Sequence, residues 1–324
     1  KIAAAAPAKS AAKAVAKSTG KRGRNEEVAQ LESENKRSRG KQLSGDEEEE
    51  HIAKLKSLSS INGLETSGEG INTTNDKGET YLHFAAFNAE PQLVKWLIEK
   101  GADCNMQDEK GRTALSRCAS GDHKCVLMLL QGSADVDLAD KDGISPLHYA
   151  SLSSSCENVN VMLQYEAHVH TFDKINGSSP LHDACFSGSL KCVKALVEAG
   201  AQVDMHTKST KGKNKEAVAL HYAAQQNRHD IVEYLIKQKA SINIQDARGC
   251  TPLHYAVYTG SVDVVRVLLK NKADVAKHNL SGQNAEKLME MSPIISKDSS
   301  SREKITKMLH PDSKKVKESG CVIC

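Results

Sequence analysis

Aromatic residues are scarce in this 324-residue chain, at 4% of its composition with a single Trp. A single large core usually depends on bulky side chains, so this scarcity argues against one deep globular core. The apolar content of 39% instead draws heavily on Ala, Leu and Val. Such a composition favours many small helix–helix contacts.

Long apolar runs are also missing, and no stretch approaches the roughly 20 residues that a membrane-spanning helix requires. The nine Cys residues are an odd number, and those in the body of the chain form no closely spaced pairs. We therefore expect a reducing, intracellular location in the cytoplasm, the nucleus or both. The sequence begins with Lys1 rather than Met, so we expect that the true N-terminus is missing, together with any signal or transit peptide it carried.

The net charge of +3 is unevenly spread along the chain. Residues 1–41 carry eleven Lys or Arg against four Glu, about +7, and residues 287–324 carry eight basic against five acidic residues, about +3. The body between them is mildly acidic, at about −7. Residues 1–74 combine low hydrophobicity with segregated charge and no sustained periodicity, which predicts a disordered arm.

From residue 75 onward a short pattern recurs. It usually begins with Gly, continues with two or three spacer residues, and ends in Leu followed by His or Ser with Ala close behind. The anchor residues of this pattern are Leu82, Leu115, Leu147, Leu181, Leu220 and Leu253, separated by 33, 32, 34, 39 and 33 residues. A period near 33 indicates an array of structural repeats.

Each repeat carries the pattern of two helices. Small residues after the anchor Leu allow a short first helix, and Pro146, Pro180 and Pro252 suit its first turn, where no backbone donor is lost. An apolar stripe at helical spacing follows, such as Leu93, Val94, Leu97 and Ile98 in the first repeat or Val264, Val265, Leu268 and Leu269 in the sixth. One pair of helices cannot bury its own stripe, so neighbouring repeats must stack into a continuous solenoid.

The Thr-Pro-Leu-His-x-Ala core, complete at residues 251–256, resembles the ankyrin repeat family. The resemblance covers residues 75–291, with six recognisable repeats and a degenerate C-terminal capping repeat at Asn279–Met289. It implies an all-α solenoid of stacked helix-turn-helix units joined by β-hairpins or turns. We expect disordered tails on both sides, an arm over 1–74 and a flexible basic tail over 292–324. The 39-residue spacing places about six extra residues in a basic loop over 208–216.

The same resemblance implies that partner proteins dock on the hairpin tips and on the exposed face of the first helices, which form a concave groove. Aromatic residues dominate interface hot spots, so Phe87, Phe186 and Tyr258 are the anchors we favour, although covering neighbouring helices is an equally good interpretation of them. The full predicted set of partner-binding residues is Phe87, Asn88, Lys110, Arg112, Lys141, Asp142, Lys174, Asn176, Phe186, Gln225, Gln226, Arg248 and Tyr258.

Five repeats carry a His directly after the anchor Leu, at His83, His148, His182, His221 and His254. Each occupies the same local position, so we predict a structural hydrogen bond within the turn rather than a metal site, which needs ligands clustered in space. The internal Cys residues mostly fall at helix positions, where small buried side chains are the default. No nucleophile–base pattern, phosphate-binding loop or carboxylate pair suggests catalysis, so we expect no enzyme activity and no cofactor.

Two basic clusters in the arm allow three interpretations. Their spacing fits a bipartite nuclear import signal carried by Lys21, Arg22, Arg24, Lys36, Arg37, Arg39 and Lys41. They could instead neutralise nucleic-acid phosphates, since Ala- and Lys-rich tails resemble those of linker histones. The third interpretation is a solvated tail, and no aromatic residue interleaves to stack on bases. We place import ahead of nucleic-acid binding.

The last four residues, Cys-Val-Ile-Cys at 321–324, fit a prenylation box that would lipidate Cys321, although Cys is not among the usual final residues. One lipid chain alone binds a membrane only marginally. Lys314, Lys315 and Lys317 would add up to roughly 3 kcal/mol at an anionic membrane surface. The alternative is a terminal Cys-x-x-Cys metal or redox pair, which no further Cys supports.

Together these features predict a non-enzymatic, monomeric scaffold or adaptor that binds a partner protein. Membrane tethering through Cys321 is a further hypothesis. The alternative function is that of a nuclear, chromatin-associated regulatory factor whose basic arm contacts nucleic acid. Nuclear import and lipidation point to different locations, and the sequence leaves both open.

Overall fold

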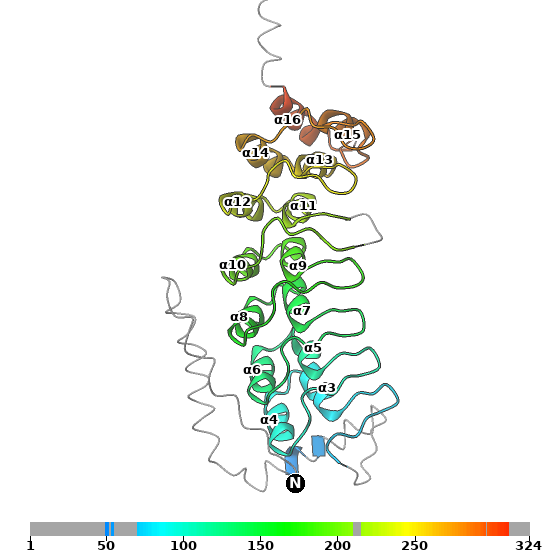
Figure 1. Cartoon of the computed structure of the whole chain (residues 1–324), viewed down its shortest axis with the longest axis vertical. Helices are drawn as coiled ribbons and strands as arrows, with labels where there is room; N and C mark the ends of the chain where they lie inside the picture. Colours follow the sequence, from blue (N-terminus) through cyan, green and yellow to red (C-terminus); the bar gives the residue numbers. More distant parts are fainter. Residues whose placement is uncertain (1–48, 52, 55–69, 210–214, 296, 311–324) are drawn as a thin grey trace, which may run out of the picture. The chain divides into compact units, whose positions relative to one another are not determined.

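The computed structural model describes residues 49–51, 53–54, 70–209, 215–295 and 297–310 of the chain. The chain divides into two units, Lys1–Ile52 and Ala53–Cys324, and all helices named below belong to the second. Between residues 70 and 310 this unit contains seven pairs of helices, each with an inner and an outer member, stacked one above the next (Figure 1). The predicted all-α solenoid is therefore confirmed. No described residue lies in a β-strand, so the connections are hairpin-shaped loops held by turn hydrogen bonds.

Most of the inner helices begin at a Ser, Thr or Asn cap residue, which fixes where the helix starts. In the sixth repeat the Thr251 hydroxyl accepts the backbone N–H of His254, and Pro252 fills the first helical position. These two devices satisfy or remove N–H groups that have no partner within the helix. The inner helices are α3 (Tyr81–Phe87), α5 (Ala114–Cys118), α7 (Pro146–Leu152), α9 (Pro180–Ser187), α11 (Ala219–Gln225), α13 (Pro252–Tyr258) and α15 (Ala285–Met291).

The outer helices carry the apolar stripes that the sequence predicts. Leu93, Val94 and Leu97 are fully buried, whereas Ile98, the fourth member of that stripe, is half-buried. Leu269, the fourth member of the apolar stripe in the sixth repeat, is also half-buried, so the last position of these stripes lies at the edge of the core. The outer helices are α4 (Pro91–Glu99), α6 (His123–Gln131), α8 (Cys156–Gln164), α10 (Leu190–Glu198), α12 (His229–Lys237), α14 (Val262–Lys270) and α16 (Ser299–Leu309).

Successive repeats contact one another along both helix rows and at the loop tips. Inner helix packs on inner helix and outer on outer throughout the stack. At the tips, the backbone N–H of Glu109 donates to the carbonyl of Lys77 at 2.8 Å, and that of Lys141 donates to the carbonyl of Lys110 at 3.0 Å. Equivalent bonds join each later pair of tips. Because every repeat contacts chiefly its neighbours, the array is quasi-one-dimensional and its stability depends on these interfaces.

The tip of the fourth loop shows why glycine recurs in the pattern. Gly177 has φ of +63°, and the carbonyl of Gly177 accepts the N–H of Lys208 at 2.9 Å. A Cβ atom added there would lie 2.1 Å from the backbone nitrogen of Ser209. Both the left-handed conformation and the close approach of two backbones therefore require the residue without a side chain.

The seventh repeat is more complete than the sequence indicates. Helix α15 packs on α13, and α16 packs on α14 and α15. Ile305 and Leu309 on α16 are buried. The assignment of a flexible tail from residue 292 is therefore wrong for residues 299–309. The reason is that this helix buries only a few apolar side chains and lacks the Leu-His anchor by which the other repeats are recognised.

Replacement of Ile305 by Ala tests whether α16 caps the array. Ile305 is fully buried, so we expect the change to cost about 2–4 kcal/mol of unfolding free energy in a denaturant titration of the full chain. Lys304→Ala, at an exposed position on the same helix, serves as the matched control and should cost less than about 0.5 kcal/mol. Equal effects of the two substitutions would mean that α16 is not part of the cooperative fold.

Several predictions from the sequence fall outside the described residues. These are residues 1–48, 52 and 55–69 of the predicted disordered arm, the import clusters within it, and the centre of the basic insertion, residues 210–214. The tail lysines Lys314, Lys315 and Lys317 and the lipidation residue Cys321 also lie outside. They stay predictions. Residues 49–51 and 53–54 of the predicted arm are described and are helical.

Candidate functional site

One register position of the inner helices is repeatedly apolar and exposed. It lies five residues after the anchor position, at or just beyond the end of each inner helix. The side chains there are 62% exposed for Phe87, 51% for Leu152, 44% for Phe186, 41% for Tyr258 and 59% for Met291. We call this row, with the polar positions included, the inner-helix stripe: Phe87, Ser120, Leu152, Phe186, Gln225, Tyr258 and Met291.

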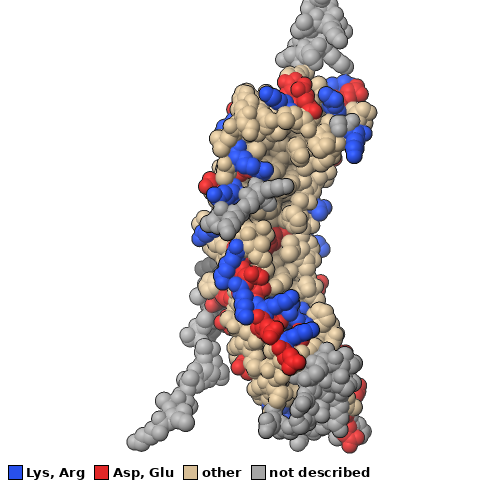
Figure 2. Space-filling view, turned by 90° about the vertical axis from the view of Figure 1, so that its right-hand side faces the viewer, with Lys and Arg blue, Asp and Glu red and all other residues tan. Residues whose placement is uncertain are grey.

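The inner-helix stripe concentrates the apolar surface of the array. Of the nine exposed large apolar side chains among the described residues, five belong to it. Figure 2 shows the side of the array that bears the loop tips, where uncharged atoms cover most of the face and charged side chains gather in separate patches. Exposed apolar side chains gathered on one face of a protein indicate an interaction site.

The loop tips form the second predicted surface. Lys110, Lys141, Asp142, Lys174, Asn176 and Arg248 are exposed there, as a binding role requires. Arg112 is half-buried, and its guanidinium binds Asp108 of its own loop at 2.7 Å. Arg112 therefore stabilises its own loop, and only part of its side chain is accessible to a partner.

The remaining predicted residues lie at the ends of the inner helices. Phe87, Asn88, Phe186 and Tyr258 are exposed, whereas Gln225 and Gln226 are half-buried. Leu152 and Met291 are absent from the predicted set, which favoured aromatic residues as anchors. Both lie five residues after an anchor position, so that spacing was the signal that could have identified them.

Four of the five recurring His residues link their repeat to the next. In the fourth repeat the backbone N–H of Ser179 donates to Nδ1 of His182 at 3.1 Å, and Nε2 of His182 donates to the carbonyl of Met205 at 3.0 Å. The same two contacts fix His83, His148 and His221, with Nε2 bound to the carbonyls of Arg112, Ser178 and Cys250. The predicted structural role is confirmed, and the bridge extends beyond the local turn. In the second repeat Ser116 replaces His, and its hydroxyl reaches only Thr113.

Burial keeps these imidazoles neutral. Desolvation lowers the pKa of His182 and of His221 to about 4. It also lowers the pKa of His83, His148 and His254 below the usual value. A neutral ring with Nε2 protonated matches the contacts, because Nδ1 accepts a backbone N–H while Nε2 donates to a carbonyl. The His row thus belongs to the framework that holds the inner-helix stripe in register.

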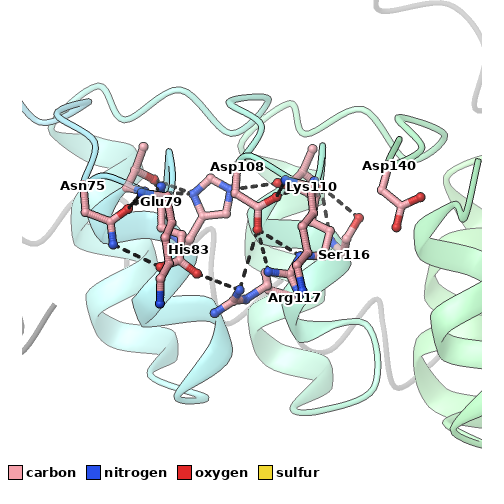
Figure 3. A network of polar contacts seen from close by, with 12 residues as sticks. Asn75, Glu79, His83, Asp108, Lys110, Ser116, Arg117 and Asp140 are labelled. Atoms are coloured by element: carbon pink, nitrogen blue, oxygen red, sulfur yellow. Dashed lines mark hydrogen bonds and ion pairs between the residues drawn. The ribbon is translucent and has the colours of Figure 1, made fainter. Parts of the chain in front are cut away.

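A polar network joins the first two repeats (Figure 3). Arg117 on α5 binds Glu79 of the preceding repeat at 2.9 Å and lies 3.7 Å from Asp108 of its own loop. Its guanidinium also lies over the ring of Phe87, 4.8 Å from the ring centre. Arg117 therefore connects two loops and supports the first apolar residue of the stripe.

Neither the cysteines nor the His row forms a metal centre in the described part of the chain. No group of three or more potential ligands is close enough to hold an ion there. Burial raises the pKa of Cys104 to about 11 and of Cys125 to about 12, so both thiols stay protonated. The buried Cys residues act as small apolar side chains, as predicted. Within the described segments, no helix has the length and apolar character to cross a bilayer.

The stacked inner and outer helices and the linked loop tips define a helical repeat solenoid. The family model for ankyrin repeats matches residues 50–140, 132–208 and 203–279. The chain therefore belongs to the ankyrin repeat family, as the resemblance in its sequence implied. Ankyrin repeats are typically interaction modules rather than enzymes, so the chain is a protein-interaction scaffold.

The curated relatives share the repeats but are much longer proteins. Rabankyrin-5 of Mus musculus is 30% identical over 191 residues, which make up 58% of this chain and 13% of the relative. Neurogenic locus notch homolog protein 1 of Xenopus laevis is 32% identical over 136 residues, or 41% of this chain and 5% of the relative. The crystal structure of the human ASB11 ankyrin repeat domain superimposes with a TM-score of 0.60 at 26% identity, covering 67% of this chain and 96% of that domain.

Proposed function

We propose that this chain is an adaptor whose inner-helix stripe and loop tips bind a segment of one partner protein. The observation that carries the proposal is the repetition of exposed apolar side chains at a single register position. Five such residues in seven repeats form a row that water solvates poorly and that an elongated partner segment can cover. Polar gaps at Ser120 and Gln225 divide the row, which favours a partner with apolar residues in separate clusters.

The loop tips support the same proposal through charge. Exposed Lys110, Lys141 and Lys174 occur in three successive tips, interleaved with Glu109 and Asp142. Mixed charge at the rim of an apolar surface orients a partner and sets the rate of association more than the final affinity. We therefore assign affinity to the stripe and orientation to the tips.

Substitution of four stripe residues tests this proposal. Changing Phe87, Leu152, Phe186 and Tyr258 to Ser in the full chain should abolish capture of the partner while leaving the helical content unchanged, because these side chains are exposed. Capture is measured by affinity purification followed by mass spectrometry. The matched control changes four exposed outer-helix residues to Ser: Lys191, Glu233, Arg266 and Lys270. Equal capture by both variants would refute the assignment of the stripe.

For the tail we propose lipidation of Cys321, assisted by Lys314, Lys315 and Lys317 at an anionic membrane surface. The support is the aliphatic pair in the Cys-Val-Ile-Cys ending and its basic flank. The competing proposal is nuclear import through the basic clusters at 21–24 and 36–41. Mass spectrometry of the C-terminal peptide from cells separates them, because a chain that still ends in unmodified Cys324 would exclude lipidation.

A further inference from the structure

In three repeats the residue one position after the recurring His position contacts the aspartate of its own loop. Tyr149 donates its hydroxyl hydrogen to Oδ2 of Asp140 at 2.7 Å, and Tyr255 does the same for Asp246 at 2.6 Å. In the second repeat the equivalent residue is Arg117, which faces Asp108. In these repeats the inner helix supplies a donor to the aspartate of its own loop.

The fourth repeat reverses this arrangement. The equivalent residue is Asp183 on α9, an acceptor, and the loop aspartate is Asp173. Asp173 already accepts the backbone N–H groups of Ile175, Asn176 and Ser178 at 2.8, 2.6 and 2.7 Å. No donor from the described part of the chain reaches the Asp183 carboxylate. Burial and the neighbouring charge of Asp173 raise the pKa of Asp183 well above its usual value.

An ionised carboxylate at this position destabilises the free protein, because burial removes part of its hydration and no described side chain donates to it in return. Three other repeats carry Tyr, an uncharged donor, at the equivalent position: Tyr149, Tyr222 and Tyr255. Asp183 is therefore better explained as a binding residue whose cationic partner belongs to another molecule.

The side chains around Asp183 indicate what that partner is. Phe186 lies one helical turn further along α9, so the two residues share a helix face. The ring of Tyr222 packs edge-on against Phe186, with ring centres 6.5 Å apart. Leu152, the stripe residue of the preceding repeat, is 51% exposed. Asp183 is half-buried, so part of its side chain remains open to solvent on the helix that carries the stripe residue Phe186.

We infer that the fourth repeat accepts one positively charged side chain, a Lys or Arg of the partner segment, whose apolar neighbours lie on Leu152 and Phe186. The inference rests on the proposed function and adds the chemistry of the partner. A single cation would complement both Asp183 and Asp173, and it would supply a donor of the kind that Tyr149 and Tyr255 supply to the aspartates of their own loops. Partly desolvated charge pairs of this kind fix the register of a bound segment.

Selection from a random library of displayed 12-residue peptides tests the inference. The full chain and its Asp183→Asn variant are used as parallel targets, with Asp230→Asn, an exposed outer-helix change, as the control. We expect peptides that carry a Lys or Arg between apolar residues to dominate the pools from the wild type and the control. Each such peptide should bind Asp183→Asn at least tenfold more weakly in solution.

The outcomes separate the two proposals. Enriched peptides that lack a basic residue, or that bind Asp183→Asn equally well, overturn the inference and leave the adaptor function standing. Failure to enrich any peptide on the wild type counts against the adaptor function itself and removes the basis of the inference.

Thermal unfolding of the free chain provides an independent check. Asp183→Asn and Asp183→Tyr should raise the unfolding midpoint at pH 7.5 by about 2–4 °C, since each replaces the charged acceptor with a group that can donate to Asp173. Asp230→Asn should leave the midpoint nearly unchanged. A lower midpoint for Asp183→Asn would show that the carboxylate already has a cationic partner within the chain and would overturn the inference.

Discussion

Lowering the pH from 7.5 to 5 is expected to reduce the unfolding free energy of the array by about 4 kcal/mol through His182 and His221 alone. Burial holds the folded-state pKa of each at about 4, whereas an unfolded His titrates at 6.5. A group with a depressed folded pKa stabilises the fold above its unfolded pKa, and this stabilisation is lost as the pH falls toward the folded value. At pH 5 each His therefore contributes about 2 kcal/mol less than at neutral pH.

Urea titrations at a series of pH values measure this loss. The lowered pKa values of His83, His148 and His254 add to the loss of unfolding free energy at low pH. The raised pKa of Asp183 opposes this loss, so the titration is best done with the Asp183→Asn variant as the parent chain. Replacing His182 by Gln should shrink the difference between pH 7.5 and pH 5 by about 2 kcal/mol. Replacing the exposed His229 by Gln should leave it unchanged. A flat profile in the parent chain would mean that the imidazoles are not buried as neutral bridges.

Replacement of Arg117 by Met is expected to cost about 3 kcal/mol of unfolding free energy. The side chains of Arg117, Glu79 and Asp108 are only 12%, 11% and 2% exposed, so the pairing is largely shielded from water. Removing the guanidinium leaves Glu79 with only the amide of Asn75, at 3.0 Å. Asp108 keeps Arg112, so most of the cost should come from Glu79.

A double substitution and an exposed pair provide the controls for Arg117. Adding Glu79→Gln to Arg117→Met should recover part of the lost stability, because the stranded carboxylate is removed. Lys237→Met breaks the exposed ion pair with Glu233, whose partners are 68% and 53% exposed, and should cost under about 1 kcal/mol. If Arg117→Met cost no more than Lys237→Met, the network of Figure 3 would contribute little to the fold.

Much of the architecture follows from the sequence because each repeat is recognised locally. The anchor Leu residues are buried where the period places them, and the His residues occupy one slot in successive repeats. A His that recurs every 33 residues or so must make the same contact each time, so its structural role could be predicted. The hydrogen bond from Nε2 to a carbonyl of the next repeat could not be predicted, because a local sequence pattern does not show how closely two repeats stack.

The features that the sequence left hidden depend on contacts between repeats. Arg117 and Glu79 are 38 residues apart, and nothing in either neighbourhood marks them as partners. Asp183 stands out only when its repeat is compared position by position with those of Tyr149 and Tyr255, whose hydroxyls donate to a loop aspartate. Helix α16 escaped detection because it belongs to the fold through Ile305 and Leu309 and through packing on α14 and α15.

Site-specific photo-crosslinking measures the central claim most directly, namely that the inner-helix stripe is the partner-binding surface. A photoreactive phenylalanine analogue is placed at Leu152, in the stripe, or at Glu233, on an outer helix, and both positions are exposed. If the stripe binds the partner, irradiation of the full chain with its captured partner gives a crosslinked product from position 152 and none from position 233. Crosslinking from position 233 alone would contradict it.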